Sequence, residues 1–167
     1  MRRWYGRVAL GVLLPITPLP LGAQHPTARP AAQVLFVCEH GTVKSLLAKL
    51  LFDEYAAQVG LKVRAVARGT HADSAVPPWM RARLATDQLP LGAWRPQTLG
   101  PRDLKTASLV VSFDVPLAAT ATARVPHAQW DGLPSVSTQY AEGRDAIKAR
   151  VRQLVDSLRR AGGPGKP

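Results

Sequence analysis

The only cysteine in the chain, Cys38, comes directly after a short apolar run at residues 33–37 and before a turn at residues 39–43. Lys44 and Ser45 follow this turn, at the start of a leucine-rich stretch. A turn that leads from a strand into a helix directs several backbone N–H groups, and the positive end of the helix dipole, toward one point. Such a concavity binds a tetrahedral oxyanion, and a cysteine at its mouth should favour the thiolate form. A thiolate in contact with a bound phosphate is an in-line nucleophile.

Each residue of the turn has an expected place in this phosphate-binding loop. Gly41 can take a positive φ, Lys44 adds a positive charge, and the Ser45 hydroxyl can hydrogen-bond the sulfur. Glu39 should point outward, because a negative charge facing the anion would oppose binding. His40 would either crowd the site or be a titratable group beside the thiolate. The expected phosphate-binding residues are Glu39, His40, Gly41, Thr42, Val43, Lys44 and Ser45. The alternative is a buried structural cysteine at the end of a strand.

The composition limits the other possibilities. The chain has 167 residues, which suits one domain, and its single cysteine excludes a disulfide framework and a cysteine-rich zinc module. No group of His, Cys and Asp residues has metal-ligand spacing, so we predict no metal and no other cofactor. The net charge of +11 favours an anionic small molecule or a phosphorylated substrate as partner. No aromatic–basic motif indicates nucleic acid binding, and we expect a monomer.

The N-terminal segment has the pattern of an export signal. Three arginines precede an apolar core, and Gly22 and Ala23 supply small residues for cleavage. We therefore expect a signal peptide at residues 1–23, a linker at residues 24–32, and a mature protein that is periplasmic or secreted. A leader that is not a signal would leave the protein in the cytoplasm. No apolar run reaches the roughly 18–20 residues of a spanning helix, so we expect no integral membrane segment after signal removal.

Strand-like and helix-like segments alternate along the rest of the chain. Apolar runs predict strands at residues 33–37, 62–67 and 109–113, and a short fourth strand at residues 129–130. Helical spacing predicts helices at residues 44–59, 77–86 and 142–160, with a connector rich in Pro and Gly at residues 89–101. The alternation implies an α/β domain at residues 33–161, built on a parallel sheet with helices on both faces, and a flexible tail at residues 162–167.

Several segments carry a family resemblance. Val34-Leu-Phe-Val-Cys38, then five residues, then Lys44-Ser45 and an apolar helix, resembles low-molecular-weight protein tyrosine phosphatases and the arsenate reductases that share their fold. Residues 68–70 are similar to the family's Ala-Gly-Thr turn, and residues 107–113 to its Ala-Asp-Leu-Val-Val strand. Residues 130–134 resemble the segment before the last helix in the arsenate-reductase branch. The likeness covers roughly residues 33–160 and implies a three-layer α/β/α domain with a four-stranded parallel sheet.

Two departures from the family pattern concern catalysis. Lys44 stands where the family has arginine, so a point charge replaces a planar fork that can hold two phosphoryl oxygens. We expect this to remove roughly 2–4 kcal/mol of transition-state stabilisation. The family's proton donor lies in an Asp-Pro pair before the last helix, and Ser135-Val136 occupies that position here. Asp131 is the nearest carboxylate in that loop and is predicted as the donor, with Asp114 as second candidate. The alternative for Asp131 is a plain turn residue.

The resemblance implies a thiol hydrolase that cleaves phosphate monoesters, of the phosphotyrosine type, through a phosphocysteine on Cys38. Lys44, Ser45 and Asp131 would assist this nucleophile. A non-catalytic oxyanion-binding protein, or pseudo-phosphatase, is the alternative that Lys44 and the missing Asp-Pro pair favour. A single-cysteine arsenate reductase is the third hypothesis. It would need an external thiol, because the chain has no second cysteine.

Overall fold

The computed structural model describes residues 32–118 and 122–162 of the chain. Its four strands form one parallel sheet in the order β2-β1-β3-β4. The strands are β1 (Gln33–Cys38), β2 (Arg64–Gly69), β3 (Leu109–Ser112) and β4 (His127–Gln129). The predicted four-stranded parallel sheet is therefore confirmed. The expected signal peptide at residues 1–23, and nearly all of the expected linker and tail, lie outside the described residues.

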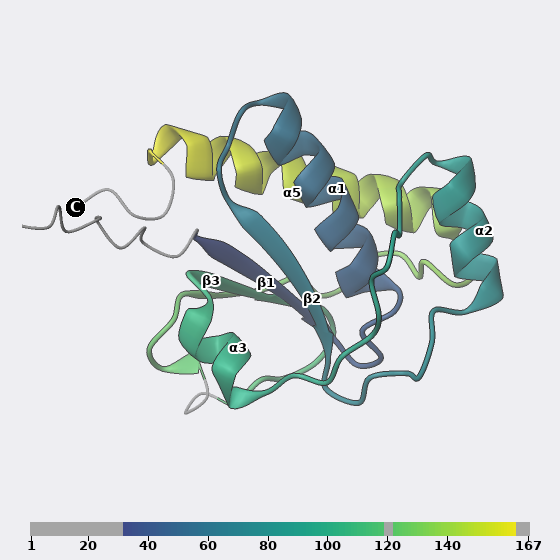
Figure 1. Cartoon of the computed structure of the whole chain (residues 1–167), viewed down its shortest axis with the longest axis horizontal. Coiled ribbons are helices and arrows are strands. Elements are labelled where there is room, and N and C mark those ends of the chain that lie inside the picture. The colour runs from purple at the N-terminus through teal and green to yellow at the C-terminus, as the bar shows by residue number, and fades with distance from the viewer. Residues whose placement is uncertain (1–31, 119–121, 163–167) are drawn as a thin grey trace, which may run out of the picture.

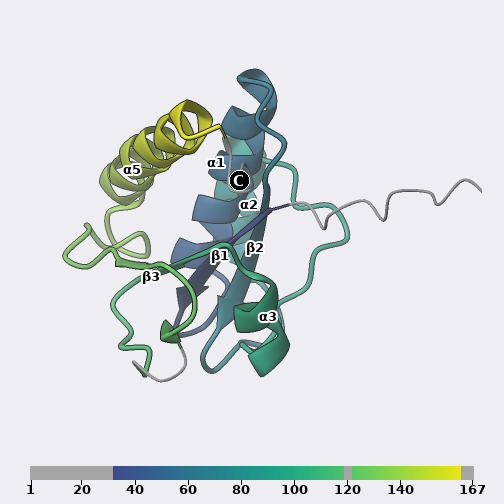
Figure 2. The same ribbon diagram turned by 90° about the vertical axis from the view of Figure 1, so that its left-hand side faces the viewer.

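Helices cover both faces of the sheet, as the alternating elements predict (Figures 1 and 2). Helices α1 (Lys44–Gln58) and α5 (Tyr140–Arg160) lie on one face, and the short helix α3 (Pro101–Thr106) lies on the other. Helix α2 (Pro78–Thr86) buries Met80 and Leu84 in the core on the side of α1 and α5. None of the described helices has the length and apolar character needed to cross a membrane.

Strand β1 is the centre of the core because all six of its residues are buried. Val34 and Phe36 belong to the cluster that α1 and α5 cover, while Leu35 and Val37 belong to the cluster on the side of α3. Successive side chains of a strand point to opposite faces, so a continuous apolar run is the pattern of a strand buried on both sides. The register places the carboxyl end of β1, at Cys38, beside Gly69 of β2.

Several elements differ from prediction by one or two residues, and one helix was not predicted. Helix α3 was not predicted, although Pro101 is at its first turn and the Asp103 carboxylate accepts the Gly100 N–H at 2.9 Å, an arrangement that favours a helix start. Strand β4 begins at His127, two residues before its predicted start, and Trp130 lies beyond its end. No residue of β4 is fully buried, and its sequence therefore lacks the apolar pattern that would have predicted a strand there. Strand β2 starts at Arg64 rather than at residue 62.

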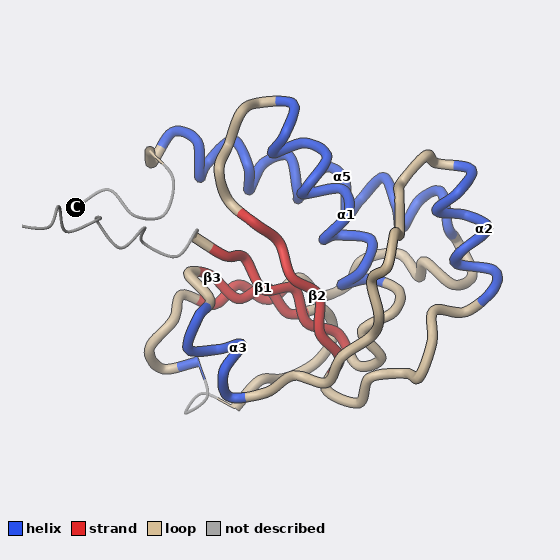
Figure 3. The backbone as a smooth tube through the Cα atoms, in the orientation of Figure 1, coloured by secondary structure: helices blue, strands red, loops and turns tan. Residues whose placement is uncertain are grey.

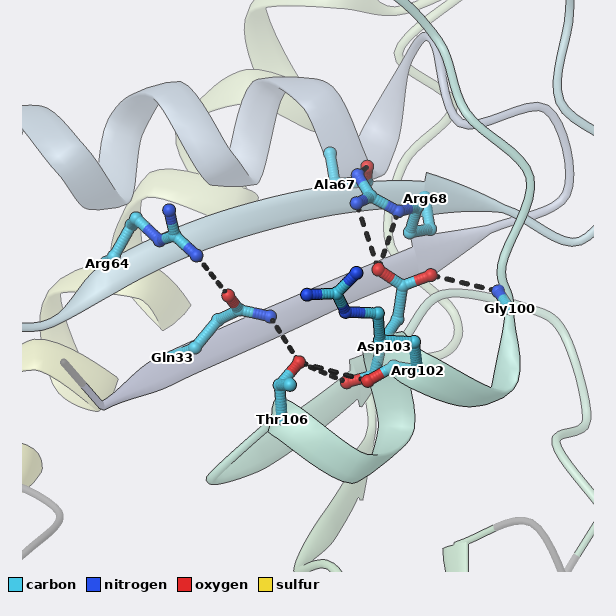
Figure 4. Close-up of polar contacts among 8 residues, drawn as sticks. All are labelled: Gln33, Arg64, Ala67, Arg68, Gly100, Arg102, Asp103 and Thr106. Carbon is cyan, nitrogen blue, oxygen red and sulfur yellow. Dashed lines mark hydrogen bonds and ion pairs between the residues drawn. The ribbon is translucent and has the colours of Figure 1, made fainter. Parts of the chain in front are cut away.

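A polar network attaches α3 to the sheet (Figure 4). Arg68 of β2 donates to Asp103 from Nε and from Nη2, both at 2.9 Å. The other oxygen of Asp103 accepts the Gly100 N–H, so one carboxylate holds both the strand and the start of the helix. Gln33 of β1 accepts a hydrogen bond from Arg64 at 2.7 Å on the same face. Leu104 of α3 also packs against the apolar cluster on this face, so polar and apolar contacts together hold α3 on the sheet.

The outer edge of β2 has partners from two other segments. The Asp53 carboxylate of α1 accepts the Ala65 N–H at 3.1 Å. The loop between α2 and α3 runs past this edge (Figure 3), where Gly69 donates to the Gln97 carbonyl at 3.1 Å and accepts from the Leu99 N–H at 2.8 Å. Gly69, which lies beside Cys38 in the sheet, therefore has backbone hydrogen-bond partners on its outer side as well.

Candidate active site

The Cys38 sulfur lies in the turn between β1 and α1, as the sequence predicts. Its Sγ accepts the Gly41 N–H at 3.3 Å and lies 3.1 Å from the Ser45 hydroxyl. Cys38 is 7% exposed and belongs to the core cluster, but it also lines a cavity. The sulfur therefore has one backbone N–H and one hydroxyl within hydrogen-bond distance at the wall of the cavity.

The turn closes into a cup because three of its carbonyl groups are held on one side. The carbonyls of Cys38, Glu39 and His40 accept the N–H groups of residues 70, 71 and 73 at 3.0, 2.8 and 3.1 Å. In a planar trans peptide the C=O and the next N–H point in opposite directions. The N–H groups of residues 39, 40 and 41 are therefore directed away from that segment, and the last of them contacts the sulfur. Successive amides directed to one side of a turn form a concavity of the kind that binds anions in other proteins.

Glycine at position 41 is required by the way the cup packs. Gly41 has φ of +72°, and a Cβ there would lie 2.8 Å from the Gly69 backbone nitrogen. A side chain would be strained by its backbone angle and would also collide with β2. The predicted role of Gly41 thus has a second cause that the sequence does not show, the close approach of the loop to the neighbouring strand.

Lys44 forms an ion pair with Asp114, the residue that follows β3 by two positions. Both side chains line the cavity that contains Cys38. Asp114 has φ of +51°, a left-handed conformation that Asp tolerates better than most residues. Its N–H donates to the Asp131 carboxylate at 2.9 Å, and Asp131 also accepts the Gln129 side-chain amide at 2.5 Å. Asp131 does not line the cavity, so the structure brings Asp114, and not Asp131, together with Cys38 and Lys44.

His40 and Glu39 form the rim of the same cavity. The Glu39 side chain is 63% exposed, and its carboxylate lies 3.8 Å from His40 Nε2. His40 Nδ1 lies 3.3 Å from Asp73, whose other oxygen accepts the hydroxyl of the fully buried Thr42 at 2.6 Å. Asp73 therefore fixes two residues of the loop. From the sequence, Asp73 could line the mouth of the pocket, but a solvated loop residue is the favoured interpretation, because no local pattern links the loop after β2 to the loop after β1.

The cavity over Cys38 has a volume of about 190 Å³. The loop before α5 supplies Ser135 and Ser137 to its wall, so Ser135 lies at the cavity in the place where the family pattern would put an acid. The apolar part of the wall consists of Val43, Phe113, Val115 and Val136. Within residues 32–118 and 122–162, no three or more His, Cys, Asp or Glu side chains are grouped to hold a metal ion.

These features together define a class: an α/β protein with one thiol at the end of a central parallel strand, facing a cavity beside the loop that leads into the first helix. The family model described as low molecular weight phosphotyrosine protein phosphatase matches residues 33–162, and the chain belongs to this family. The comparison with curated proteins returned no match.

Solved structures agree with this fold. A thioredoxin-dependent arsenate reductase from Corynebacterium glutamicum has a TM-score of 0.65 at 24% identity, over 80% of this chain and 65% of that one, so the chain spans just under two thirds of that protein. A low molecular weight protein tyrosine phosphatase from Bacillus subtilis has a TM-score of 0.63 at 21% identity, over 77% and 97% of the two chains. An arsenate reductase from Archaeoglobus fulgidus has a TM-score of 0.58 at 25% identity, over 74% and 98%.

Proposed function

We propose that this protein hydrolyses phosphate monoesters through a phosphocysteine formed on Cys38. The observation that carries the proposal is the position of the sulfur, which accepts the Gly41 N–H and lies beside the Ser45 hydroxyl at the wall of an open cavity. The sulfur attacks phosphorus, the bond from phosphorus to the ester oxygen breaks, and the leaving oxygen takes up a proton. A water molecule then cleaves the S–P bond, which releases phosphate and restores the thiolate.

The loop amides would hold the phosphoryl oxygens in the first step, because N–H groups directed at a developing negative charge stabilise it without reorganisation. Lys44 would add one positive charge to this set. The apolar wall formed by Val43, Phe113 and Val136 suits an aromatic ester group, which supports a phosphotyrosine-type substrate.

One observation favours binding without turnover as the second candidate function. The cation that would face the anion, Lys44, is already paired with Asp114. An anion must compete with that carboxylate for Lys44, and a lysine cannot present two donors in a fixed plane. Reduction of arsenate, the activity named for two of the similar structures, is the third candidate. It would depend on an external thiol because the chain has one cysteine.

Hydrolysis of para-nitrophenyl phosphate by the wild type and by Cys38→Ser tests the proposal. We expect slow turnover by the wild type, none by the variant, and inhibition or binding by phosphate in both. Equal rates for the two proteins would overturn the role of Cys38. Phosphate binding without turnover in the wild type would identify the non-catalytic protein. Turnover only with arsenate and an added thiol would identify the reductase.

We also propose that the protein is exported and acts as a monomer. The arginines, apolar core and small residues of the first 23 positions support export. The mass of the protein recovered from a bacterial host's envelope or medium would show cleavage near residue 23. Light scattering of that material would give the oligomeric state. Retention of the full-length chain in the cytoplasm would contradict export.

A further inference from the structure

Besides the sulfur and the rim carboxylate Glu39, three ionisable side chains that could carry a proton to a leaving oxygen line the cavity: His40, Asp114 and Lys44, of which the last two are paired with each other. A proton donor must hold its proton when the substrate arrives. Asp114 is engaged as a carboxylate by Lys44, so it can donate only after it has given up that ion pair and taken up a proton. Its position therefore suits it to hold Lys44 rather than to act as an acid.

His40 has the opposite arrangement. Its Nδ1 lies 3.3 Å from an Asp73 oxygen, and its Nε2 lies 3.8 Å from a Glu39 oxygen. Each ring nitrogen therefore lies within ion-pair distance of a carboxylate oxygen, and an imidazole can carry a proton on either nitrogen. Its side chain is 57% exposed at the rim, where a leaving group would depart.

Asp73 can keep this ring in place because Asp73 is itself held at two points. One of its oxygens accepts the buried Thr42 hydroxyl at 2.6 Å, and its N–H donates to the His40 carbonyl at 3.1 Å. A carboxylate that engages Nδ1 fixes the orientation of an imidazole and leaves Nε2 to exchange the proton.

We propose that His40 is the proton-transfer residue of this site and that Asp73 is its positioning residue. The proposal rests on the proposed hydrolysis. In the first step sulfur bonds to phosphorus, the phosphorus–oxygen bond breaks, and the leaving oxygen takes the Nε2 proton. In the second step the neutral imidazole takes a proton from the attacking water, whose oxygen bonds to phosphorus as the S–P bond breaks. The cycle returns both the thiolate and the protonated ring.

The charged groups around His40 come from several elements. Glu39 and Asp73 lie closest to its ring nitrogens, and the Lys44–Asp114 pair and the Cys38 sulfur line the same cavity. The rate for a substrate whose leaving oxygen needs a proton should depend on His40, whereas the rate for a good leaving group should not.

The test compares phenyl phosphate, whose leaving oxygen needs a proton, with para-nitrophenyl phosphate, whose leaving oxygen departs unassisted. The variant is His40→Asn, because the Asn amide can still donate to Asp73 and only the Nε2 group is lost. We expect kcat/KM for phenyl phosphate to fall by about 100-fold, the usual contribution of an acid, and that for para-nitrophenyl phosphate to fall only a few-fold. The matched control is His71→Asn, in an exposed neighbouring residue that does not line the cavity.

Equal losses for the two substrates would overturn the proposal, because they would show a role in loop structure or anion binding. A substrate-dependent loss in Asp114→Asn or Asp131→Asn instead would also overturn it, and would identify the carboxylic acid that acts. A wild type that is no faster than Cys38→Ser would overturn the hydrolysis and the role of His40 together. Only this last result includes an inactive wild type, so an absence of hydrolysis can be told apart from an incorrect role for His40.

Discussion

Lys44 and Asp114 form an ion pair at the cavity that contains the only cysteine of the chain. The lysine comes from the first turn of α1, and the aspartate comes from the turn after β3. Asp114 reaches this position with a left-handed backbone, and its N–H is held by Asp131. Apart from His40, Lys44 is the only basic side chain that the described residues place at the cavity wall, and the pair neutralises its charge.

Replacing Lys44 with arginine should increase turnover. A guanidinium can keep one donor on Asp114 and present another to the phosphoryl group, whereas a lysine has one point charge to share. We expect kcat/KM for para-nitrophenyl phosphate to rise roughly ten-fold, part of the stabilisation that a well-placed donor supplies. Lys49→Arg on the same helix, where Lys49 pairs with Asp53, is the control. Lower turnover in Lys44→Arg would mean that the cavity is built around lysine.

Removing the negative charge of Asp114 should tighten anion binding. Asp114→Asn keeps a residue that tolerates the positive φ and frees Lys44 to face the anion. Because the pair is partly exposed, we expect a modest effect, a roughly three- to ten-fold lower inhibition constant for phosphate. Asp145→Asn removes the same charge from the exposed face of α5 and controls for net charge. If both variants change the constant equally, the effect is not local to the cavity.

A side chain at Gly41 should destabilise the protein more than one at Gly60. Both glycines have a positive φ, of +72° and +69°, but a Cβ at position 60 has nothing within 4 Å. Gly60→Ala should lower the free energy of unfolding by roughly 1–2 kcal/mol, the cost of the left-handed backbone. Gly41→Ala should add the collision with β2, another 1–3 kcal/mol or so. Urea unfolding of both variants measures the difference, and equal losses would show that the loop relaxes without cost.

Tyr140 should make the folded state sensitive to alkaline pH. Burial and the 2.5 Å hydrogen bond from its hydroxyl to Asp87 raise the pKa of Tyr140 well above its ordinary value. The unfolded chain loses this proton near pH 10, roughly, while the folded chain keeps it, so the stabilisation is complete below that pH and is lost as the pH rises further. Tyr140→Phe should therefore give a shallower loss of stability above about pH 10. Thermal unfolding across that range tests this, and parallel curves for the two proteins would contradict it.

The sequence predicts those parts of the molecule in which local pattern and burial agree. The apolar run of β1 and the spacing of α5 located both elements closely, and the position of Cys38 before the turn predicted the contact with Ser45. Helix α3 was missed because its start depends on a capping contact rather than on an apolar stripe, and it has no buried residue.

The carboxylate that faces the cavity could not be predicted from the sequence. Asp73, Asp114 and Asp131 come from three different loops, and only the packing of those loops decides which carboxylate faces the cavity. Position along the chain favoured Asp131 because it precedes the last helix. In the structure Asp131 contacts the backbone of Asp114, a pairing across two strand ends that no local pattern encodes.

The contacts along β2 have a consequence for the behaviour of the protein at high concentration. An outer strand with open N–H and C=O groups is a template on which another chain can add a strand, and this is a common start of aggregation. Here Asp53 takes the Ala65 N–H, and residues 97–99 take both backbone groups of Gly69. The strand that lies beside the Cys38 loop is thereby protected from strand addition by a side chain and a loop of its own chain.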